Sequence, residues 1–170
     1  MFIYIYSAIF LYLFIGLFLF FIQRKMIFNQ SGKLRRPKEY GLQQIKEVFV
    51  NTPDNLSLIA WFQKPKYNNP TMIFFHGNSS DIGERAYKIE RYINNNWGVL
   101  LVAWRGYSGN MGNPTEKNLY IDGESAINWV HRNTNYLNNN IVLYGESLGC
   151  GVALELGLKN KFKSIILEAP

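Results

Sequence analysis

The feature that most constrains this chain is the pentapeptide Gly145-Glu146-Ser147-Leu148-Gly149, which separates an apolar run from a stretch with helical spacing. The apolar run, Ile141 to Tyr144, is too short for a helix and suits a strand that is buried on both faces. A strand that turns at once into a helix strains the residue at the bend and crowds its neighbours. The pattern therefore predicts a sharp strand-to-helix turn at Ser147, where Gly145 and Gly149 relieve the crowding.

Such a turn lifts the serine hydroxyl above the sheet, at a helix N-terminus whose main-chain amides have no partner within the helix. The Leu148 amide then points to any negatively charged oxygen that forms beside Ser147, and the helix dipole favours that charge. We therefore interpret Ser147 as a candidate catalytic nucleophile. The alternative is a tight turn with an idle serine, in which the small residues serve packing alone.

A second constraint lies at the N-terminus, where residues 1–22 carry no charged side chain and 15 of them are Phe, Ile or Leu. As a helix, this run reaches about 33 Å, against a hydrocarbon core of roughly 30 Å. It lacks the basic start and the small-residue cleavage site of a secretory signal, and it has no polar face that would suit a core helix. We predict an uncleaved transmembrane anchor over residues 1–23.

Basic residues follow the apolar run closely, and no acidic residue precedes Glu39. Positive charge on this side of a span predicts that the globular part faces the cytoplasm and that the basic residues contact anionic membrane lipid. They account for much of the net charge of +6, and no nucleic-acid motif accompanies them, so we do not expect nucleic-acid binding. This basic collar, in a linker over residues 24–38, consists of Arg24, Lys25, Lys33, Arg35, Arg36 and Lys38.

Residues 39–170 alternate short apolar runs with stretches of helical spacing, which is typical of an α/β fold with a largely parallel sheet. Two strand-like runs, at 47–51 and 56–63, flank a Thr-Pro-Asp-Asn turn and predict an antiparallel hairpin. Thr115 is the predicted N-cap of a helix that carries Trp129 on its inward face. The other predicted strands lie at 72–75, 99–104, 141–144 and 164–167, and the predicted helices at 82–95, 115–132 and 148–158.

His76-Gly77-Asn78 follows the strand predicted at 72–75, and Trp104-Arg105-Gly106-Tyr107 comes at the end of the next strand. In this order and spacing, with residues 145–149, these motifs resemble the single-pass, membrane-anchored branch of the α/β-hydrolase family, some of whose members are protein depalmitoylases. The resemblance covers roughly residues 39–170. It implies a serine hydrolase fold with helices flanking the sheet, in which the amides of Asn78 and Leu148 form the oxyanion hole and His76 and Gly77 support the turn.

The same resemblance places the acid and the histidine of the catalytic triad after the seventh and eighth strands, whereas the last strand predicted here is the sixth. We therefore expect an incomplete domain with about six of eight strands and little turnover from the chain as it stands. His76 belongs to the oxyanion loop and His131 to a flanking helix, so neither is predicted to be the base for Ser147. Glu168 is a candidate acid with no histidine to orient.

Two functional hypotheses stay open. One is a membrane-anchored serine hydrolase that acts on acyl esters or thioesters, and the other is a non-catalytic, membrane-tethered binding module with the shape of a hydrolase. A nucleotide-binding protein is ruled out, because neither G-x-G-x-x-G nor G-x-x-x-x-G-K-[ST] is present. The single cysteine, Cys150, rules out an internal disulfide and a Cys-x-x-Cys site, and we expect no cofactor and no metal.

Overall fold

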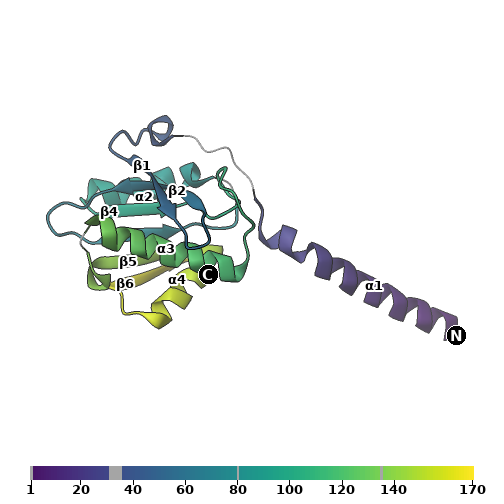
Figure 1. Ribbon diagram of the computed structural model, residues 1–170. Helices are drawn as coiled ribbons and strands as arrows, with labels where there is room; N and C mark the ends of the chain where they lie inside the picture. The colour runs from purple at the N-terminus through teal and green to yellow at the C-terminus, as the bar shows by residue number, and fades with distance from the viewer. Residues whose placement is uncertain (1, 31–35, 80, 135) are drawn as a thin grey trace.

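A long apolar helix and a six-stranded sheet flanked by helices make up the protein (Figure 1). The computed structural model describes residues 2–30, 36–79, 81–134 and 136–170, so Lys33 and Arg35 of the basic collar lie outside the described residues. The α-helices are α1 (Phe2–Ile27), α2 (Ala86–Asn94), α3 (Glu116–Thr134) and α4 (Leu148–Lys159), and the short 3-10 helices are η1 (Pro37–Tyr40), η2 (Ile82–Arg85) and η3 (Asn138–Asn140). The strands are β1 (Lys46–Asn51), β2 (Ser57–Gln63), β3 (Thr71–Phe75), β4 (Gly98–Val102), β5 (Ile141–Glu146) and β6 (Ser164–Glu168).

The strands form one sheet in the order β1-β2-β4-β3-β5-β6. The predicted hairpin is confirmed, because β1 and β2 pair antiparallel, with Lys46 opposite Phe62, and β2 also runs antiparallel to β4. The remaining pairs, β3 with β4, β3 with β5 and β5 with β6, are parallel, as the alternating pattern predicts. The carboxyl ends of β3, β4, β5 and β6 therefore meet at one edge of the sheet.

Both faces of the central strands are buried, which explains their continuous apolar sequences. In β3, Ile73 and Phe75 pack with residues of α3 and α4, whereas Met72 and Phe74 pack with residues of α2 on the opposite face. Two helices thus cover one side of the sheet and one helix covers the other side (Figure 1). Burying both faces removes a large apolar area from water and fixes the strand register.

Several predicted boundaries move by a few residues for identifiable reasons. β4 ends at Val102 rather than at Trp104, because the Trp104 main-chain N–H donates to the His76 side chain, at Nε2 and 3.2 Å, and not to a neighbouring strand. The helix predicted at 82–95 begins as the 3-10 helix η2, where the Asp81 carboxylate accepts from the Gly83 N–H at 2.7 Å. The predicted N-cap is confirmed, since Thr115 Oγ1 accepts from the Asn118 N–H at 3.1 Å.

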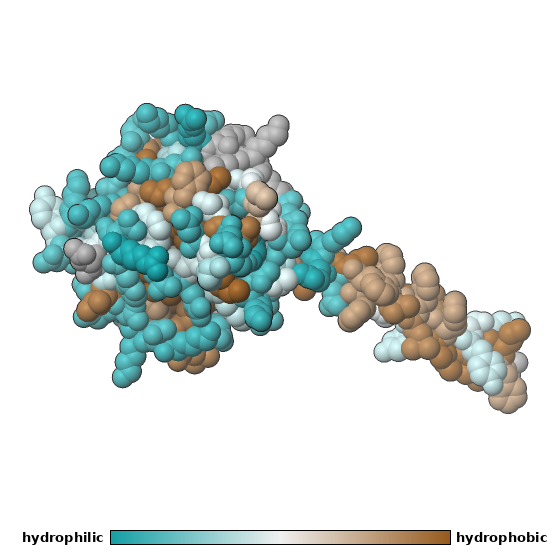
Figure 2. Space-filling model, in the orientation of Figure 1, coloured by the Kyte–Doolittle hydropathy of each residue, from teal (hydrophilic) through white to brown (hydrophobic). Residues whose placement is uncertain are grey.

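Helix α1 projects from the globular body and exposes apolar side chains along its length (Figures 1 and 2). It is long and apolar enough to cross a membrane. The helix continues to Ile27, four residues beyond the predicted end of the anchor, and its last turn contacts the body. The Asn78 side-chain amide donates to the Ile27 carbonyl at 3.0 Å, and the Arg24 guanidinium donates to the Pro114 carbonyl at 3.3 Å.

Candidate active site

Ser147 occupies a sharp bend between the end of β5 and the start of α4. Its backbone has φ +47° and ψ −112°, a conformation that residues with a side chain rarely adopt. Two main-chain hydrogen bonds hold it: the Ser147 N–H donates to the Glu168 carbonyl at 2.8 Å, and the Ser147 carbonyl accepts from the Cys150 N–H at 2.9 Å. The residue is exposed, and its hydroxyl has no hydrogen-bond partner within the described part of the chain.

Close backbone contacts explain the two glycines that flank the bend. A Cβ atom at Gly149 would overlap the carbonyl oxygen of Phe75, the last residue of β3. A Cβ atom at Gly145 would lie 2.6 Å from the Cα atom of Cys150 and 2.7 Å from its nitrogen. Separations of this kind involve backbone atoms, which cannot rotate away, so the first turn of α4 packs onto the sheet only with glycine at both positions.

The loop after β3 lies directly beside Ser147. A Cβ atom at Gly77 would be 3.5 Å from the Cβ atom of Ser147, in ordinary van der Waals contact. Before it, the His76 ring is fully buried, with Nδ1 2.7 Å from the Gly77 carbonyl, while the Trp104 indole N–H donates to the His76 carbonyl at 2.8 Å. The structure thus brings together four of the predicted site residues, namely His76, Gly77, Ser147 and Leu148, and Asn78 follows on the same loop.

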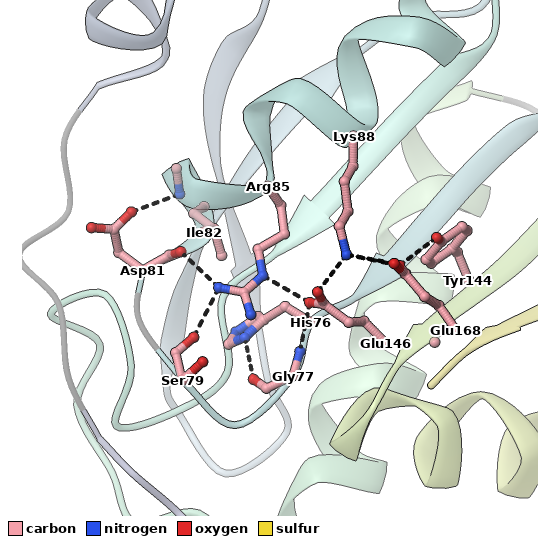
Figure 3. A network of polar contacts seen from close by, with 12 residues as sticks. His76, Gly77, Ser79, Asp81, Ile82, Arg85, Lys88, Tyr144, Glu146 and Glu168 are labelled. Atoms are coloured by element: carbon pink, nitrogen blue, oxygen red, sulfur yellow. Dashed lines mark hydrogen bonds and ion pairs between the residues drawn. The ribbon is translucent and has the colours of Figure 1, made fainter. Parts of the chain in front are cut away.

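The Glu146 carboxylate fixes this loop to the turn. Its Oε2 atom accepts from the Gly77 main-chain N–H at 3.1 Å and from Arg85 Nε at 2.8 Å, while Oε1 accepts from Lys88 Nζ at 2.6 Å (Figure 3). Arg85 also donates to the Ser79 carbonyl at 2.8 Å, so Glu146 binds the start of the loop and Arg85 binds its later part. Although burial opposes ionisation, the bonds from Lys88, Arg85 and Gly77 lower the pKa of Glu146 to about 2.

The same network reaches the last strand of the sheet. Lys88 Nζ contacts both carboxylate oxygens of Glu168, at 2.9 and 2.8 Å, and the Tyr144 hydroxyl donates to Glu168 Oε2 at 2.6 Å (Figure 3). The hydrogen bonds from Lys88 and Tyr144 lower the pKa of Glu168. Glu168, considered from the sequence as a candidate acid, therefore binds a lysine and a tyrosine in this structure.

Neither histidine is placed to take a proton from Ser147. Both ring nitrogens of His76 are engaged, because Nε2 accepts from Trp104 and Nδ1 contacts the Gly77 carbonyl. Burial, followed by the nearby charge of Arg85, lowers the pKa of His76 to about 3, so the ring is neutral at physiological pH. His131 lies near the end of α3, where Nε2 is 2.9 Å from Asn138 Oδ1. The contacts of His76 join the loop after β3 to the start of the loop after β4.

A second buried ion pair holds the loop that follows β4. Arg105 donates to the fully buried Asp122 through its main-chain N–H, Nε and Nη2, at 3.0, 2.9 and 2.6 Å. The same guanidinium also donates to the Asp54 carboxylate, and the shorter of the two bonds joins Arg105 Nη1 to Asp54 Oδ2 at 2.6 Å. Trp104-Arg105-Gly106-Tyr107 is therefore a structural motif here, which fastens the loop to α3 and to the hairpin turn.

Across the described ranges, no group of three His, Cys, Asp or Glu side chains could hold a metal ion.

Sequence reasoning missed three residues that shape the site, namely Arg85, Lys88 and Glu146. One signal was present, because Glu146 lies two residues after the buried strand predicted at 141–144, and a carboxylate close to a buried strand requires a partner. Helical spacing places Arg85 and Lys88 three residues apart and therefore on one face, which was a second signal. Their contact with Glu146 spans 61 and 58 residues of sequence, and no periodicity in the sequence encodes such a long-range contact.

A strained serine at the carboxyl end of a parallel strand, at the start of a helix, is the mark of one class of protein, the α/β hydrolases. The crystal structure of an α/β hydrolase from Vibrio vulnificus has this fold, with a TM-score of 0.70 over 85% of this chain and 54% of that chain, at 22% identity. No family model matches the chain.

Two curated relatives agree with this fold. Protein bem46 of Schizosaccharomyces pombe is 31% identical over 140 residues, which cover 78% of this chain and 46% of the relative. The human alpha/beta hydrolase domain-containing protein 17B is 33% identical over 103 residues, or 59% of this chain and 35% of the relative. The chain thus spans about half the length of the first of these relatives and about a third of the second. Sequence likeness and shared fold place it in the α/β-hydrolase family.

The two glycines on α4 provide a first prediction. Gly149→Ala forces a Cβ atom into the Phe75 carbonyl and should lower the free energy of unfolding by roughly 1–3 kcal/mol or more. Gly151→Ala, two residues along the same helix, places its Cβ atom in open space and should be neutral or stabilising by up to about 1 kcal/mol. Urea unfolding of the full chain in detergent measures both values. Equal effects of the two substitutions would contradict the proposed packing of the turn.

Acidification tests the Glu146 network. Because the fold lowers the pKa of Glu146 from 4.5 to about 2, its contribution is fully present above pH 4.5 and is lost as the pH falls toward 2. Glu146→Gln should therefore lower the free energy of unfolding at pH 7 by roughly 1.5–3 kcal/mol and flatten its dependence on pH between 4.5 and 2. Glu90→Gln, at an exposed position on α2, is the matched control and should change little. A Glu146→Gln profile parallel to that of the unmodified protein would disprove the role.

Proposed function

We propose that this protein is a membrane-anchored serine hydrolase that acts on acyl esters or thioesters, with Ser147 as its nucleophile. One observation carries the proposal: the exposed residue Ser147 stands at a strained turn, beside the Gly77 loop and at the N-terminus of α4. Membership of the α/β-hydrolase family supports it. An idle serine would not require a strained backbone conformation, which costs about 1–3 kcal/mol.

In the proposed reaction, Ser147 Oγ attacks the acyl carbonyl carbon while its proton passes to a general base. The developing oxyanion accepts hydrogen bonds from the Leu148 and Asn78 amides, and the N-terminal end of α4 adds a favourable electrostatic contribution. Collapse of the intermediate breaks the carbon–oxygen or carbon–sulfur bond, and water later releases the acid from the acyl-enzyme. The Glu146 contact with Gly77 keeps the loop in place, so that no reorganisation is needed when charge forms.

The base is the part of this mechanism that the described residues do not supply. Both histidines are bound elsewhere, and the proposal therefore requires an imidazole from outside these 170 residues. The same observation favours a second candidate function, a membrane-tethered binding module that keeps the shape of a hydrolase without turnover. A serine that lacks its base retains only the contributions of oxyanion donors and substrate binding.

The membrane is part of the proposal. Helix α1 would span the bilayer, and Arg24, Lys25 and the other residues of the basic collar would contact anionic lipid on the cytoplasmic side. Because the last turn of α1 contacts Asn78 and Pro114, the candidate active site would face the membrane surface rather than the bulk solvent. Substrates that carry an acyl chain in the membrane fit this placement.

A fluorophosphonate probe with added imidazole separates the two functions. Ser147 Oγ displaces fluoride from phosphorus, and free imidazole replaces the missing base by accepting the hydroxyl proton. In the full chain in detergent, we expect mass spectrometry to find the label on Ser147, with a labelling rate that imidazole raises by at least about tenfold. Ser147→Ala should abolish labelling, whereas Ser57→Ala, at an exposed serine in β2, should not. A folded protein that stays unlabelled in imidazole would exclude the hydrolase and favour the binding module.

A further inference from the structure

A groove of about 430 Å³ lies where the last turn of α1 meets the first turns of α3 and α4. Its volume falls within the range of ligand sites, which is about 300–1,000 Å³. The charged residues in its lining are Arg24 and Glu116, both exposed. Most of the remaining wall is apolar, with contributions from Ile27, Phe28, Leu119, Leu148, Gly151 and Val152.

Helix α1 builds one wall of this groove and is held in place by specific contacts. Phe28 packs against the core cluster that contains Leu119 and Val152. The Ile27 carbonyl accepts from the Asn78 side chain at 3.0 Å, and the Arg24 guanidinium reaches the Pro114 carbonyl. The last turn of α1 is therefore docked on the same face of the body that carries the candidate oxyanion loop.

The groove also reaches the residue next to the candidate nucleophile. Leu148, which lines it, is the residue after Ser147 and the first residue of α4. Asn78, which binds the anchor, belongs to the same loop as Gly77, where an added Cβ atom would lie 3.5 Å from the Cβ atom of Ser147. An acyl group attached to Ser147 would therefore lie next to this apolar groove. The groove leads to the C-terminal end of α1, an apolar helix of 26 residues.

We propose that this groove binds the long, unbranched acyl chain of a membrane-borne ester or thioester, and that the last turn of α1 is a specificity-determining wall of the site. The inference rests on the proposed function and adds the part of the substrate that is recognised. The anchor then does more than hold the protein at the membrane, because Ile27 and Phe28 would contact the chain directly. The apolar lining, its position beside Ser147 and its closeness to the bilayer all select an aliphatic occupant over a polar one.

A palmitic acid analogue with a diazirine at its terminal carbon tests the groove in the full chain, reconstituted in phosphatidylcholine nanodiscs. We expect photo-crosslinks at Leu119, Leu148 or Val152, and saturated fatty acids should compete more strongly by roughly fourfold for each added methylene until the groove is filled. Crosslinks to residues 2–22 of α1 report background contact with the bilayer. Crosslinks confined to those residues would overturn the inference.

Matched variants sharpen the test. Gly151→Trp fills the groove and should reduce crosslinking there by about tenfold or more, whereas Leu158→Trp, at an exposed position of α4 outside the groove lining, should preserve it. Phe28→Ala removes part of the anchor wall and should weaken competition by long chains, whereas Phe21→Ala, on the exposed length of α1, should not. A Gly151→Trp protein that crosslinks as well as the unmodified protein would overturn the inference.

Ser147→Ala distinguishes failure of the groove from failure of the hydrolase. Chain binding does not use the serine hydroxyl, so this variant should crosslink like the unmodified protein. If Ser147 reacts with the fluorophosphonate but no groove residue crosslinks, the acyl-chain site is wrong and the hydrolase stands. If the groove crosslinks and Ser147 never reacts, the hydrolase is wrong and the chain-binding site stands.

Discussion

The backbone conformation of Ser147 is the constraint on which the rest of the structure depends. A positive φ at a residue with a side chain costs about 1–3 kcal/mol, and it persists only where the surroundings fix it. Here the Ser147 N–H is bound to β6 through the Glu168 carbonyl, and its carbonyl is bound into α4 through Cys150. Gly149 packs against the Phe75 carbonyl at the end of β3. Three strands and a helix thus converge on a single exposed hydroxyl.

Ion pairs and hydrogen bonds add to packing in holding the loops around that hydroxyl. Glu146 ties the Gly77 amide to Arg85 and Lys88, and Lys88 extends the network to Glu168 on the neighbouring strand. On the other side of the sheet edge, Arg105 and the buried Asp122 hold the loop after β4. Arg85, Arg105 and Asp122 are each buried and each paired with an opposite charge, which is the condition under which burying a charge is tolerable. The loops therefore stay ordered while Ser147 remains open to solvent.

Short-range sequence patterns predict most of the fold. The continuous apolar runs and the turn between β1 and β2 predict the strands, and Thr115 predicts the start of α3, because periodicity and capping are short-range properties. Gly145 and Gly149 predict the bend at Ser147 for the same reason. The Glu146 network and the docking of α1 on Asn78 were not predicted, since both join residues more than 50 positions apart. The sequence indicates which polar side chains need hydrogen-bonding or ionic partners. The partners themselves become apparent only from the folded structure.

Disulfide trapping tests most directly whether the Gly77 loop and the Ser147 turn meet. A Cβ atom at position 77 lies 3.5 Å from the Cβ atom of Ser147, within the range of about 3.5–4.5 Å that disulfides require. The double variant Gly77→Cys/Ser147→Cys, made with Cys150→Ala to remove the native thiol, should therefore form an intramolecular disulfide almost completely under mild oxidation in the folded state. Both thiols remaining free in a protein that still unfolds cooperatively would contradict the account.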